Sequence, residues 1–566
     1  MKSLFAVAVL SLPATIGLAH GADLSRRPVA QVWNWTGLYV GAHIGAGWSQ
    51  SKISDDLYNP VIYGNNVRTA AVLGGGQVGY NWQAPGTAWV FGAEGELSAL
   101  GADGSGTCFA VSGLFVSSNC RVRHEMTGSL TARLGYAMGA AGRTLVYAKG
   151  GGAWLRETMD ISNRFGAASQ RDDRFGWTVG VGVEQAIAPA WSMKLAYDYT
   201  DFGAMPISAP NTRGLAFDPF PFYVDIPGHS AQASQVLQTV KLGLNLKLGE
   251  DAGARWDTVS PSPLGLPVKA MAASLPVGTE FEVGGRVWYS FGRFQKDLGS
   301  YPAPQIQDPL NSRLTYTNET ASGELFGRLD TASNIVIKGF VGGGSLSRGK
   351  MHDEDWLIQN DSVPYTNTLS DPVVGSITYA TGDLGYDFIR DRSGKFAAFI
   401  GYNYLRDDKT AKGCIQLADQ LFYAPCAQPV SNTGPGISEK NEWYSLRIGL
   451  NGVVALTDRL SLTADAAYLP YVRFRGVDVH HQRNEAVKDS QEYGTGQGVQ
   501  LEAILSYAVT PSFSIGAGGR YWAMWATRTD AYTNAFGIRG LYQALPVRTE
   551  RFGGFLQASY TFDSAR

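Results

Sequence analysis

Apolar and polar residues alternate along most of this chain. From Trp35 onward, Leu38, Val40 and Ala42 are separated by single residues, and the same period of two returns in later segments. This period directs successive side chains to opposite faces of a β-strand. In the first half the later segments are 72–82, 89–97, 122–136, 145–154, 177–186, 191–202 and 236–248. Together with the opening segment they predict about eight strands, a number that closes into a small barrel.

The segment 236–248 alternates most clearly. Its apolar positions are expected to face lipid, and the residues between them to face the interior of a barrel. The outward set is Val240, Leu242, Leu244, Leu246 and Leu248, and the inward set is Lys241, Gly243, Asn245 and Lys247. Inward charges on other strands would pair in the lumen, as a pore lining or as a salt-bridged plug, and a narrow lumen favours the plug. These charges are Glu94, Glu96, Arg133, Lys149 and Lys194.

The second half repeats the pattern after an interruption. Residues 250–276 contain Pro261, Pro263, Pro267 and Pro276 among small and polar residues, which predicts a periplasmic linker. About ten strands then follow, at 281–294, 314–329, 335–347, 376–389, 395–405, 443–456, 460–474, 497–509, 513–526 and 551–562. Short turns alternate with long loops in both halves, as in outer-membrane barrels with periplasmic turns and extracellular loops.

Composition and the N-terminal segment agree with export. Residues 1–21 combine Lys2, a short apolar run and a small-residue cleavage pattern, which predicts a signal peptide. The rest of the chain contains no run of 18 or more apolar residues, so no membrane-spanning helix is predicted. The chain contains 69 Gly and 27 Tyr, only 17% charged residues and a net charge of -2, which gives no indication of nucleic-acid binding. We therefore expect an all-β protein with two tandem antiparallel transmembrane β-barrels, at 33–249 and 277–566, in a Gram-negative outer membrane.

Four cysteines form two local pairs. Cys108 and Cys120 lie in one predicted loop, and Cys414 and Cys426 lie in another. Each pair is expected to form a disulfide in an oxidising compartment. A zinc site is the weaker alternative, because neither pair has close ligand spacing.

Candidate chemistry lies in two short stretches of the second half. Asp353 and Asp355 stand two residues apart within 351–356, and Asp478 and His480 repeat this spacing. Each pair would share one face of a strand. Counting strands places the first pair at the end of the third strand and the second pair at the end of the seventh. Both would lie at the extracellular rim, facing each other across the mouth of a ten-stranded barrel.

This constellation suits hydrolysis by an activated water. His480 would act as general base, since an imidazole accepts a proton near neutral pH. Asp478 would fix its tautomer and stabilise the imidazolium. Asp353, supported by Asp355, would position the water and handle charge in the tetrahedral intermediate.

Short motifs in each half resemble known outer-membrane families. The segments 34–41 (Asn-Trp-Thr-Gly-Leu-Tyr-Val-Gly), 91–95 and 238–243 resemble the small OmpA-like surface-antigen barrels of Gram-negative bacteria. In the second half, Met351, Asp353, Asp355 and Trp356 match Met-x-Asp-x-Asp-Trp, and Asp478 and His480 match Asp-x-His. These residues resemble the omptins, a family of ten-stranded outer-membrane proteases. The resemblance implies a metal-independent endopeptidase without a cofactor, with Asp-Asp and His-Asp pairs and often a need for bound lipopolysaccharide.

Two positions depart from the omptin pattern. Omptins that cut beside basic residues carry an acidic residue two positions before Asp-x-His, where this chain has Gly476. A second acid near the end of the first strand is replaced by Phe294 and Gln295, with Asp297 the nearest substitute. A pocket for Lys or Arg is therefore not evident. His481 has no assigned role and is expected to be a rim histidine.

Three functions fit these residues. The first is an omptin-like protease that acts on peptides or proteins at the cell surface. The second is a non-catalytic surface antigen or adhesin, porin-like in structure, which the missing basic pocket favours. The third is a cation site built from Asp353, Glu354, Asp355, Asp478 and His480. Outer-membrane lipid and lipopolysaccharide are the expected surroundings, with Arg473 and Arg475 either contacting lipopolysaccharide phosphates or serving as plain rim charges.

Overall fold

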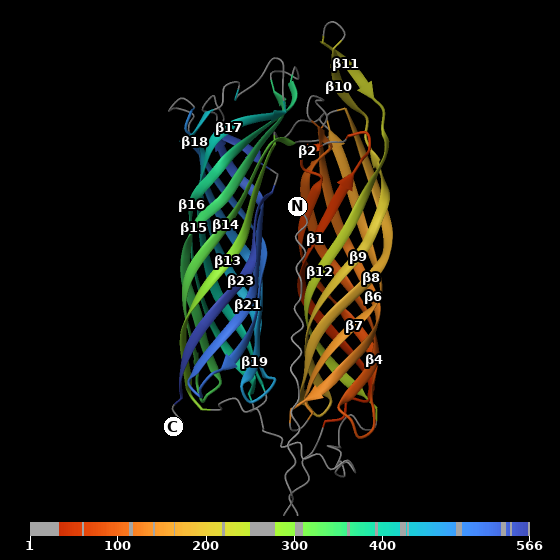
Figure 1. Ribbon diagram of the computed structural model, residues 1–566, viewed down its shortest axis with the longest axis vertical. Helices are drawn as coiled ribbons and strands as arrows, with labels where there is room; N and C mark the ends of the chain where they lie inside the picture. Colours follow the sequence, from red (N-terminus) through yellow and green to blue (C-terminus); the bar gives the residue numbers. More distant parts are fainter. Residues whose placement is uncertain are drawn as a thin grey trace, which may run out of the picture.

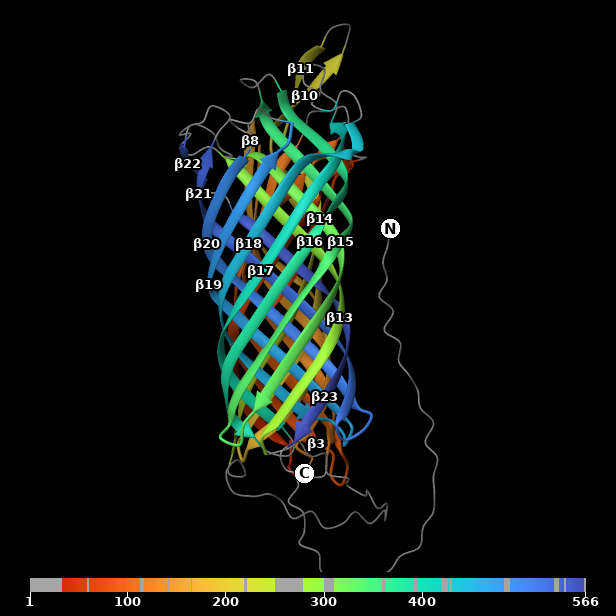
Figure 2. The ribbon, with the colours of Figure 1, turned by 90° about the vertical axis from the view of Figure 1, so that its left-hand side faces the viewer.

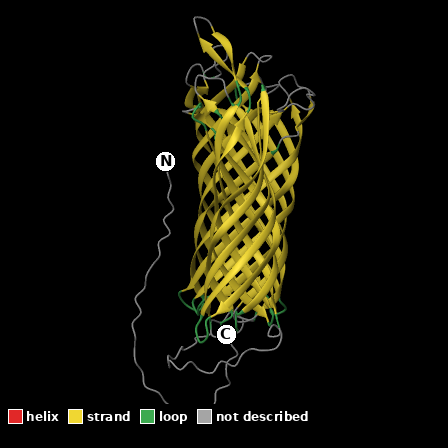
Figure 3. Ribbon diagram, turned by 90° about the vertical axis from the view of Figure 1, so that its right-hand side faces the viewer, coloured by secondary structure: helices red, strands yellow, loops and turns green. Residues whose placement is uncertain are grey.

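Strands form almost all of the described residues of this computed structural model (Figure 3), and two barrels stand side by side (Figure 1). The structure describes residues 33–58, 61–111, 117–139, 142–163, 165–217, 221–249, 278–299, 310–358, 363–390, 394–418, 426, 430–482, 489–533, 539–543 and 546–563. The predicted signal peptide at 1–21 and the predicted linker at 250–276 lie outside these residues. Within the described part of the chain, no helix is long and apolar enough to cross a membrane.

The first barrel closes on eight antiparallel strands, as the alternation predicts. Each strand pairs with its neighbours along the chain, and the last pairs with the first, so that Leu38 lies opposite Leu248. The strands are β1 (Gly37–Ser54), β3 (Asn66–Gln83), β4 (Trp89–Cys108), β6 (Ser118–Met138), β7 (Thr144–Asn163), β8 (Gly166–Ala188), β9 (Trp191–Ala209) and β12 (His229–Leu248). Two short pairs extend its loops: β2 (Val61–Tyr63) with β5 (Ala110–Val111), and β10 (Thr212–Phe217) with β11 (Pro221–Ile226).

The second barrel has ten strands in its wall, inclined to the barrel axis (Figure 2). The strands are β13 (Glu280–Gly299), β14 (Leu310–Asp330), β15 (Ile335–Ile358), β16 (Val363–Arg390), β17 (Gly394–Ala418), β18 (Val430–Ala455), β19 (Leu460–His480), β20 (Asp489–Ala508), β21 (Phe513–Thr533) and β23 (Val547–Asp563). Pairing of β13 with β23 and of β20 with β21 closes the ring, and the short strand β22 (Arg539–Gln543) pairs antiparallel with the end of β21. The predicted fold class, two tandem antiparallel barrels, is confirmed.

A belt of exposed apolar side chains on the outer wall marks the membrane-spanning part of the second barrel. On β13 it includes Phe281, Val287 and Phe291, and on β19 it ends at Tyr471. A strand crosses a bilayer with about 9–11 residues, whereas β16 has 28 residues. The strand ends beyond the belt therefore rise out of the membrane. Asp478 lies about 17 Å above Tyr471 at the usual rise and tilt of a barrel strand.

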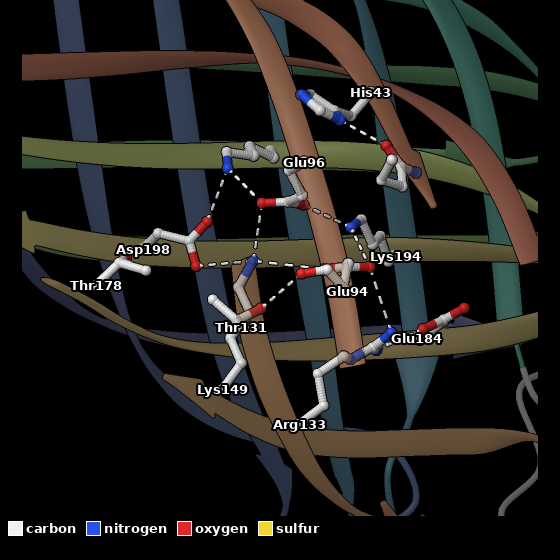
Figure 4. A network of polar contacts seen from close by, with 12 residues as sticks. His43, Glu94, Glu96, Thr131, Arg133, Lys149, Thr178, Glu184, Lys194 and Asp198 are labelled. Carbon is white, nitrogen blue, oxygen red and sulfur yellow. Dashed lines mark hydrogen bonds and ion pairs between the residues drawn. The ribbon is translucent and has the colours of Figure 1, made fainter. Parts of the chain in front are cut away.

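Charged side chains fill the interior of the first barrel (Figure 4). Lys194 donates to Glu94 at 2.8 Å and to Glu96 at 2.7 Å. Lys149 binds Glu96 at 3.0 Å, and Arg133 lies 3.4 Å from Glu94. All five side chains are buried. The predicted pairing is confirmed, in the form of a salt-bridged plug rather than the lining of an open pore.

Aromatic rings close the interior of the second barrel below its outer rim. The ring of Trp522 lies 5.1 Å from that of Trp288 and 5.3 Å from that of Tyr379, and Phe340 stacks on it at 6.2 Å. On the other side of these rings is a cavity of about 900 Å³, lined by charged residues and by turn residues of the opposite end. Packed rings therefore separate this cavity from the rim.

The two barrels contact each other through apolar side chains on their outer walls. Trp48 of β1 stacks on Tyr521 of β21, with ring centroids 4.8 Å apart, and Val240 packs against the same cluster. Leu242 packs against a second cluster that includes Phe396. The prediction that both Val240 and Leu242 face lipid is therefore wrong, because the second barrel covers this part of β12.

Near the outer rim, the contact between the barrels becomes polar. Arg313 of β14 donates to Thr107 at 3.0 Å and to Asn119 at 2.7 Å, both in the first barrel. The same guanidinium donates to Asp297 of β13 at 2.7 Å. Thr107 in turn donates to Glu354 of β15 at 2.9 Å. Each buried charge in this contact thus has a polar partner, which is the condition under which buried charges are tolerated.

Both predicted disulfides are present. Cys108–Cys120 joins β4 to β6 beside Thr107, next to the polar contact between the barrels. Cys414–Cys426 joins the end of β17 to the loop that follows it. All four cysteines are thereby used in disulfides rather than as zinc ligands.

Arg313→Met tests the polar contact. It is expected to lower the free energy of unfolding by about 3–5 kcal/mol, because the buried carboxylates of Asp297 and Glu354 lose their guanidinium. Urea unfolding in lipid vesicles, followed by tryptophan fluorescence, measures this change. The matched control is Arg406→Met, which removes a half-exposed pair with Asp408 and should cost less than about 1 kcal/mol. Equal, small losses in both variants would contradict a stabilising role for the contact.

Candidate functional site

The four candidate residues lie at the outer ends of two strands, as predicted. Asp353 and Asp355 are on β15, the third strand of the second barrel, and Asp478 and His480 are on β19, the seventh. Met351 is buried in the interior cluster, so alternation directs Asp353 and Asp355 toward the interior as well. Three strands separate β15 from β19 along the shorter arc of the ring. The two pairs therefore stand on opposite sides of the mouth.

The imidazole of His480 contacts the carboxylate of Asp478. His480 Nε2 lies 3.2 Å from Asp478 Oδ2, and both side chains share one face of β19 because they are two residues apart. Asp478 is buried, and His480 is half-buried. When the Nε2 proton points at Asp478, the lone pair of Nδ1 is available to accept a proton from another group.

A lysine reaches Asp478 from the opposite wall. Lys296 of β13 is buried, and its Nζ lies 2.8 Å from Asp478 Oδ2, 2.5 Å from Glu439 Oε1 and 3.0 Å from Glu492 Oε1. We call Glu439, Asp478 and Glu492 the acidic cluster. Strands β23, β21 and β20 separate β13 from β19, so this contact spans the mouth of the barrel.

The three carboxyl groups of the acidic cluster differ in their affinity for protons. Burial alone would raise the pKa of Asp478, but the ammonium of Lys296 and the hydrogen bond from His480 hold it well below its ordinary value. Burial raises the pKa of Glu439 to about 8, because Lys296 offsets the burial only in part and the other two carboxylates add repulsion. Burial also raises the pKa of Glu492. At neutral pH the cluster therefore holds a carboxylate at Asp478 and a proton on Glu439.

The buried hydroxyl of Tyr316 on β14 is influenced by the charges of carboxylates on both sides of the mouth. Burial raises the pKa of its hydroxyl well above the ordinary value, and the negative charges of Glu439, Asp478 and Asp353 raise it further. Carboxylates from both sides of the mouth thus act on one hydroxyl.

Sequence reasoning missed Lys296, Glu439 and Glu492. Strand register could have found the glutamates, since Glu439 lies opposite Asp478 and Glu492 lies opposite Gly476. A Cβ on Gly476 would stand 3.1 Å from Glu492 Oε2. A carboxylate from the neighbouring strand thus occupies the space next to the position where the resemblance implies an acid.

Asp297 does not replace the second missing acid. It faces the outer wall, where it accepts hydrogen bonds from Arg313 and from Ser105 of the first barrel. The interior position beside it belongs to Lys296, which carries the opposite charge. Asp297, the acid nearest in sequence to the expected position, is therefore part of the contact between the barrels.

The five residues of the predicted cation site do not converge. Glu354 faces the outer wall and accepts hydrogen bonds from Thr107 and Tyr365, whereas Asp353 and Asp355 face the interior by alternation. His481, which had no assigned role, lies 2.7 Å from Ser438. Within the residues that the structure describes, no three His, Cys, Asp or Glu side chains are grouped so as to hold a metal ion.

Glu439→Gln tests the raised pKa. The ordinary pKa of this group is 4.5, and in the folded chain it is about 8. Between these values the folded chain binds more protons than the unfolded chain, so the free energy of unfolding falls as pH rises. Glu439→Gln should make this decline shallower in urea unfolding from pH 4.5 to 8. Glu442→Gln, on the outer wall of the same strand, should keep the wild-type slope, and identical slopes in all three proteins would contradict the assignment.

Two protein families match separate halves of the chain. Residues 17–218 match the outer membrane protein beta-barrel domain, and residues 330–535 match the omptin family. The first match falls mainly on the eight-stranded barrel. The second includes Asp353, Asp355, Asp478 and His480, together with Glu439 and Glu492.

Two individual relatives agree with the first match. The 31 kDa outer-membrane immunogenic protein of Brucella melitensis is 31% identical over 263 residues, which cover 44% of this chain and 100% of that protein. The 22 kDa outer membrane protein of Rhizobium leguminosarum is 30% identical over 31% of this chain and 68% of that protein. The outer membrane protease OmpT of Escherichia coli aligns at 14% identity over 50% of this chain and 97% of that structure, with a TM-score of 0.43. Through its first half this chain therefore belongs to the family of outer-membrane immunogenic β-barrel proteins, and residues 330–535 of its second half match the omptin family.

Proposed function

We propose that the second barrel is an endopeptidase that hydrolyses peptides at the extracellular rim, with His480 and Asp478 opposite Asp353 and Asp355. The observation that carries this proposal is the 3.2 Å contact of His480 with the buried carboxylate of Asp478, at a strand end above the membrane belt. The omptin match supports a protease-like barrel and includes all four residues.

Each residue has a defined part in the reaction. His480 takes a proton from a water whose oxygen attacks the carbonyl carbon of the peptide. Asp478 stabilises the imidazolium, and Asp353, supported by Asp355, holds the water and limits charge at the tetrahedral intermediate. His480 then returns the proton to the amide nitrogen as the carbon–nitrogen bond breaks. The products are one new carboxyl and one new amino terminus.

The closed interior supports a substrate that arrives from outside the cell. The rings around Trp522 separate the rim from the periplasmic cavity. A peptide therefore reaches His480 through the extracellular mouth. Peptides and proteins at the cell surface are the substrates we propose.

Cleavage of a mixed peptide library tests the protease. The refolded protein is placed in lipopolysaccharide, because the family resemblance implies a need for it, and new termini are identified by mass spectrometry. His480→Ala should lower the cleavage rate about 10²–10⁴-fold, the usual contribution of a general base. A chelator should have no effect, since no metal takes part.

His481→Ala is the matched control and should cleave as the wild type does, because His481 binds Ser438 rather than the acidic cluster. Equal cleavage by the wild type and His480→Ala would rule out the proposed base. In that case the non-catalytic surface antigen would become the better function for this barrel.

For the first barrel we propose a structural, surface-exposed role without transport. The observation that favours it is the buried network of Glu94, Glu96, Lys149 and Lys194, which fills the lumen. The relatives of this half are named as outer-membrane immunogenic proteins, which is consistent with exposure at the surface.

Conductance across a planar lipid bilayer tests the closed lumen. The refolded chain should produce no stable current steps, because ammonium and carboxylate groups block the first barrel and aromatic rings block the second. The double variant Lys194→Ala, Glu94→Ala should permit small current steps if the salt-bridged network blocks the lumen of the first barrel. Large, stable steps from the wild-type chain would contradict the structural role.

A further inference from the structure

The acidic cluster lies directly beneath the proposed base, and its cation comes from the chain itself. Lys296 Nζ and His480 Nε2 both contact Asp478 Oδ2, at 2.8 and 3.2 Å. A group at the position of this ammonium therefore contacts the same carboxylate as the imidazole of His480. A substrate side chain that entered the cluster would lie beside the reacting groups.

Lys296 contacts only three of the six carboxyl oxygen atoms of the acidic cluster. It contacts one oxygen of each carboxyl group, and Glu439 Oε2, Asp478 Oδ1 and Glu492 Oε2 are buried without a hydrogen-bond partner. Buried carboxyl oxygens without a hydrogen-bond partner are costly, so such a site favours a group with several N–H donors. Its geometry is that of a receptor for an ammonium or a guanidinium.

A fully buried amide next to the cluster points to the same space. Asn441 has no hydrogen-bond partner for either atom of its amide group. Its Oδ1 lies 3.0 Å, and Glu492 Oε2 lies 3.1 Å, from the point where a Cβ on Gly476 would stand. Two unpartnered polar groups from different strands therefore converge beside Gly476, next to the ring of Phe474, whose Cζ lies 2.8 Å from the same point.

The ammonium of Lys296 cannot share this space with a second cation. It is buried and held by three carboxyl groups from three strands, so it has no route to solvent that keeps these contacts. A lysine or arginine of the substrate would meet this fixed positive charge at short range, where like charges repel strongly. The cluster would also have to release the proton on Glu439 to regain its negative charge.

We propose that Lys296 masks a cation-binding pocket of this site, and that it sets the specificity of the site for peptides without a basic residue at the cut. This inference rests on the proposed endopeptidase for its substrate, whereas the pocket itself is a feature of the barrel. Lys296 acts by occupying the pocket and takes no part in bond making or breaking. Removing its side chain should expose a receptor for lysine or arginine side chains.

Lys296→Ala tests the masked pocket without the need for catalysis. The probe is n-butylammonium chloride, which has the four side-chain carbons and the ammonium of lysine, one carbon more than the substitution removes, and n-butanol is its uncharged counterpart. The midpoint of urea unfolding of Lys296→Ala should rise with n-butylammonium and reach saturation, while n-butanol has no such effect. The wild type and Lys296→Arg, in which the pocket remains occupied, should not respond to either compound.

The same variants are then compared on the peptide library. The wild type should show no enrichment of Lys or Arg on either side of its cuts, and Lys296→Ala should enrich them at least tenfold. Lys395→Ala is the matched control, because it removes a buried lysine that holds Glu280 and Asp330 at the other end of this barrel. Its cleavage pattern should equal that of the wild type.

The outcomes separate this inference from the proposed function. A wild type that already prefers basic residues would overturn it, and so would a folded Lys296→Ala that neither binds n-butylammonium nor gains basic cuts. If no protein cleaves the library, the proposed function fails, and binding of n-butylammonium alone decides whether the pocket exists. If Lys296→Ala does not refold alone, recovery of folded protein with n-butylammonium but not with n-butanol supports the pocket, and no recovery with either overturns it.

Discussion

Alternation of side chains along each strand is the constraint on which the rest of this structure depends. An outward residue must meet lipid, water or another protein surface, and an inward residue must meet the opposite wall. Three consecutive residues of β13 show the consequence. Gln295 and Asp297 face the outer wall and contact Ser105 of the first barrel, whereas Lys296 between them crosses the mouth to Asp478. One short run of sequence thus connects the first barrel with the candidate site.

Charge at the rim is arranged across the barrel rather than along it. Lys296 contacts carboxyl groups on β18, β19 and β20, and a single ammonium cannot neutralise three carboxylates. Protonation of Glu439 removes one negative charge, which leaves Asp478 ionised beside His480. Burial and Lys296 therefore set the ionisation of the candidate site together.

The sequence predicts the architecture well because a barrel follows from local pattern. Period-two alternation and turn spacing are enough to count eight and ten strands, and the Asp-x-Asp and Asp-x-His spacings are enough to place four candidate residues at one rim. Register is different, because it pairs residues far apart in the chain. Glu439 and Glu492 have no motif of their own and become visible only opposite Asp478 and Gly476. Lys296 could not be predicted, since its contacts depend on which strands face each other across a closed ring.

The contact between the barrels could not be predicted from the sequence either. The alternation pattern is the same for an outward apolar residue that contacts lipid and for one that contacts another protein surface. The position of this contact gives it consequences for the candidate site. Tyr63 of the first barrel stacks on His352 with ring centroids 3.8 Å apart, and Thr107 binds Glu354. Both contacts lie on the outward face of the segment of β15 that carries Asp353 and Asp355 inward. The first barrel therefore holds the outward face of the segment whose inward face carries two of the four candidate residues.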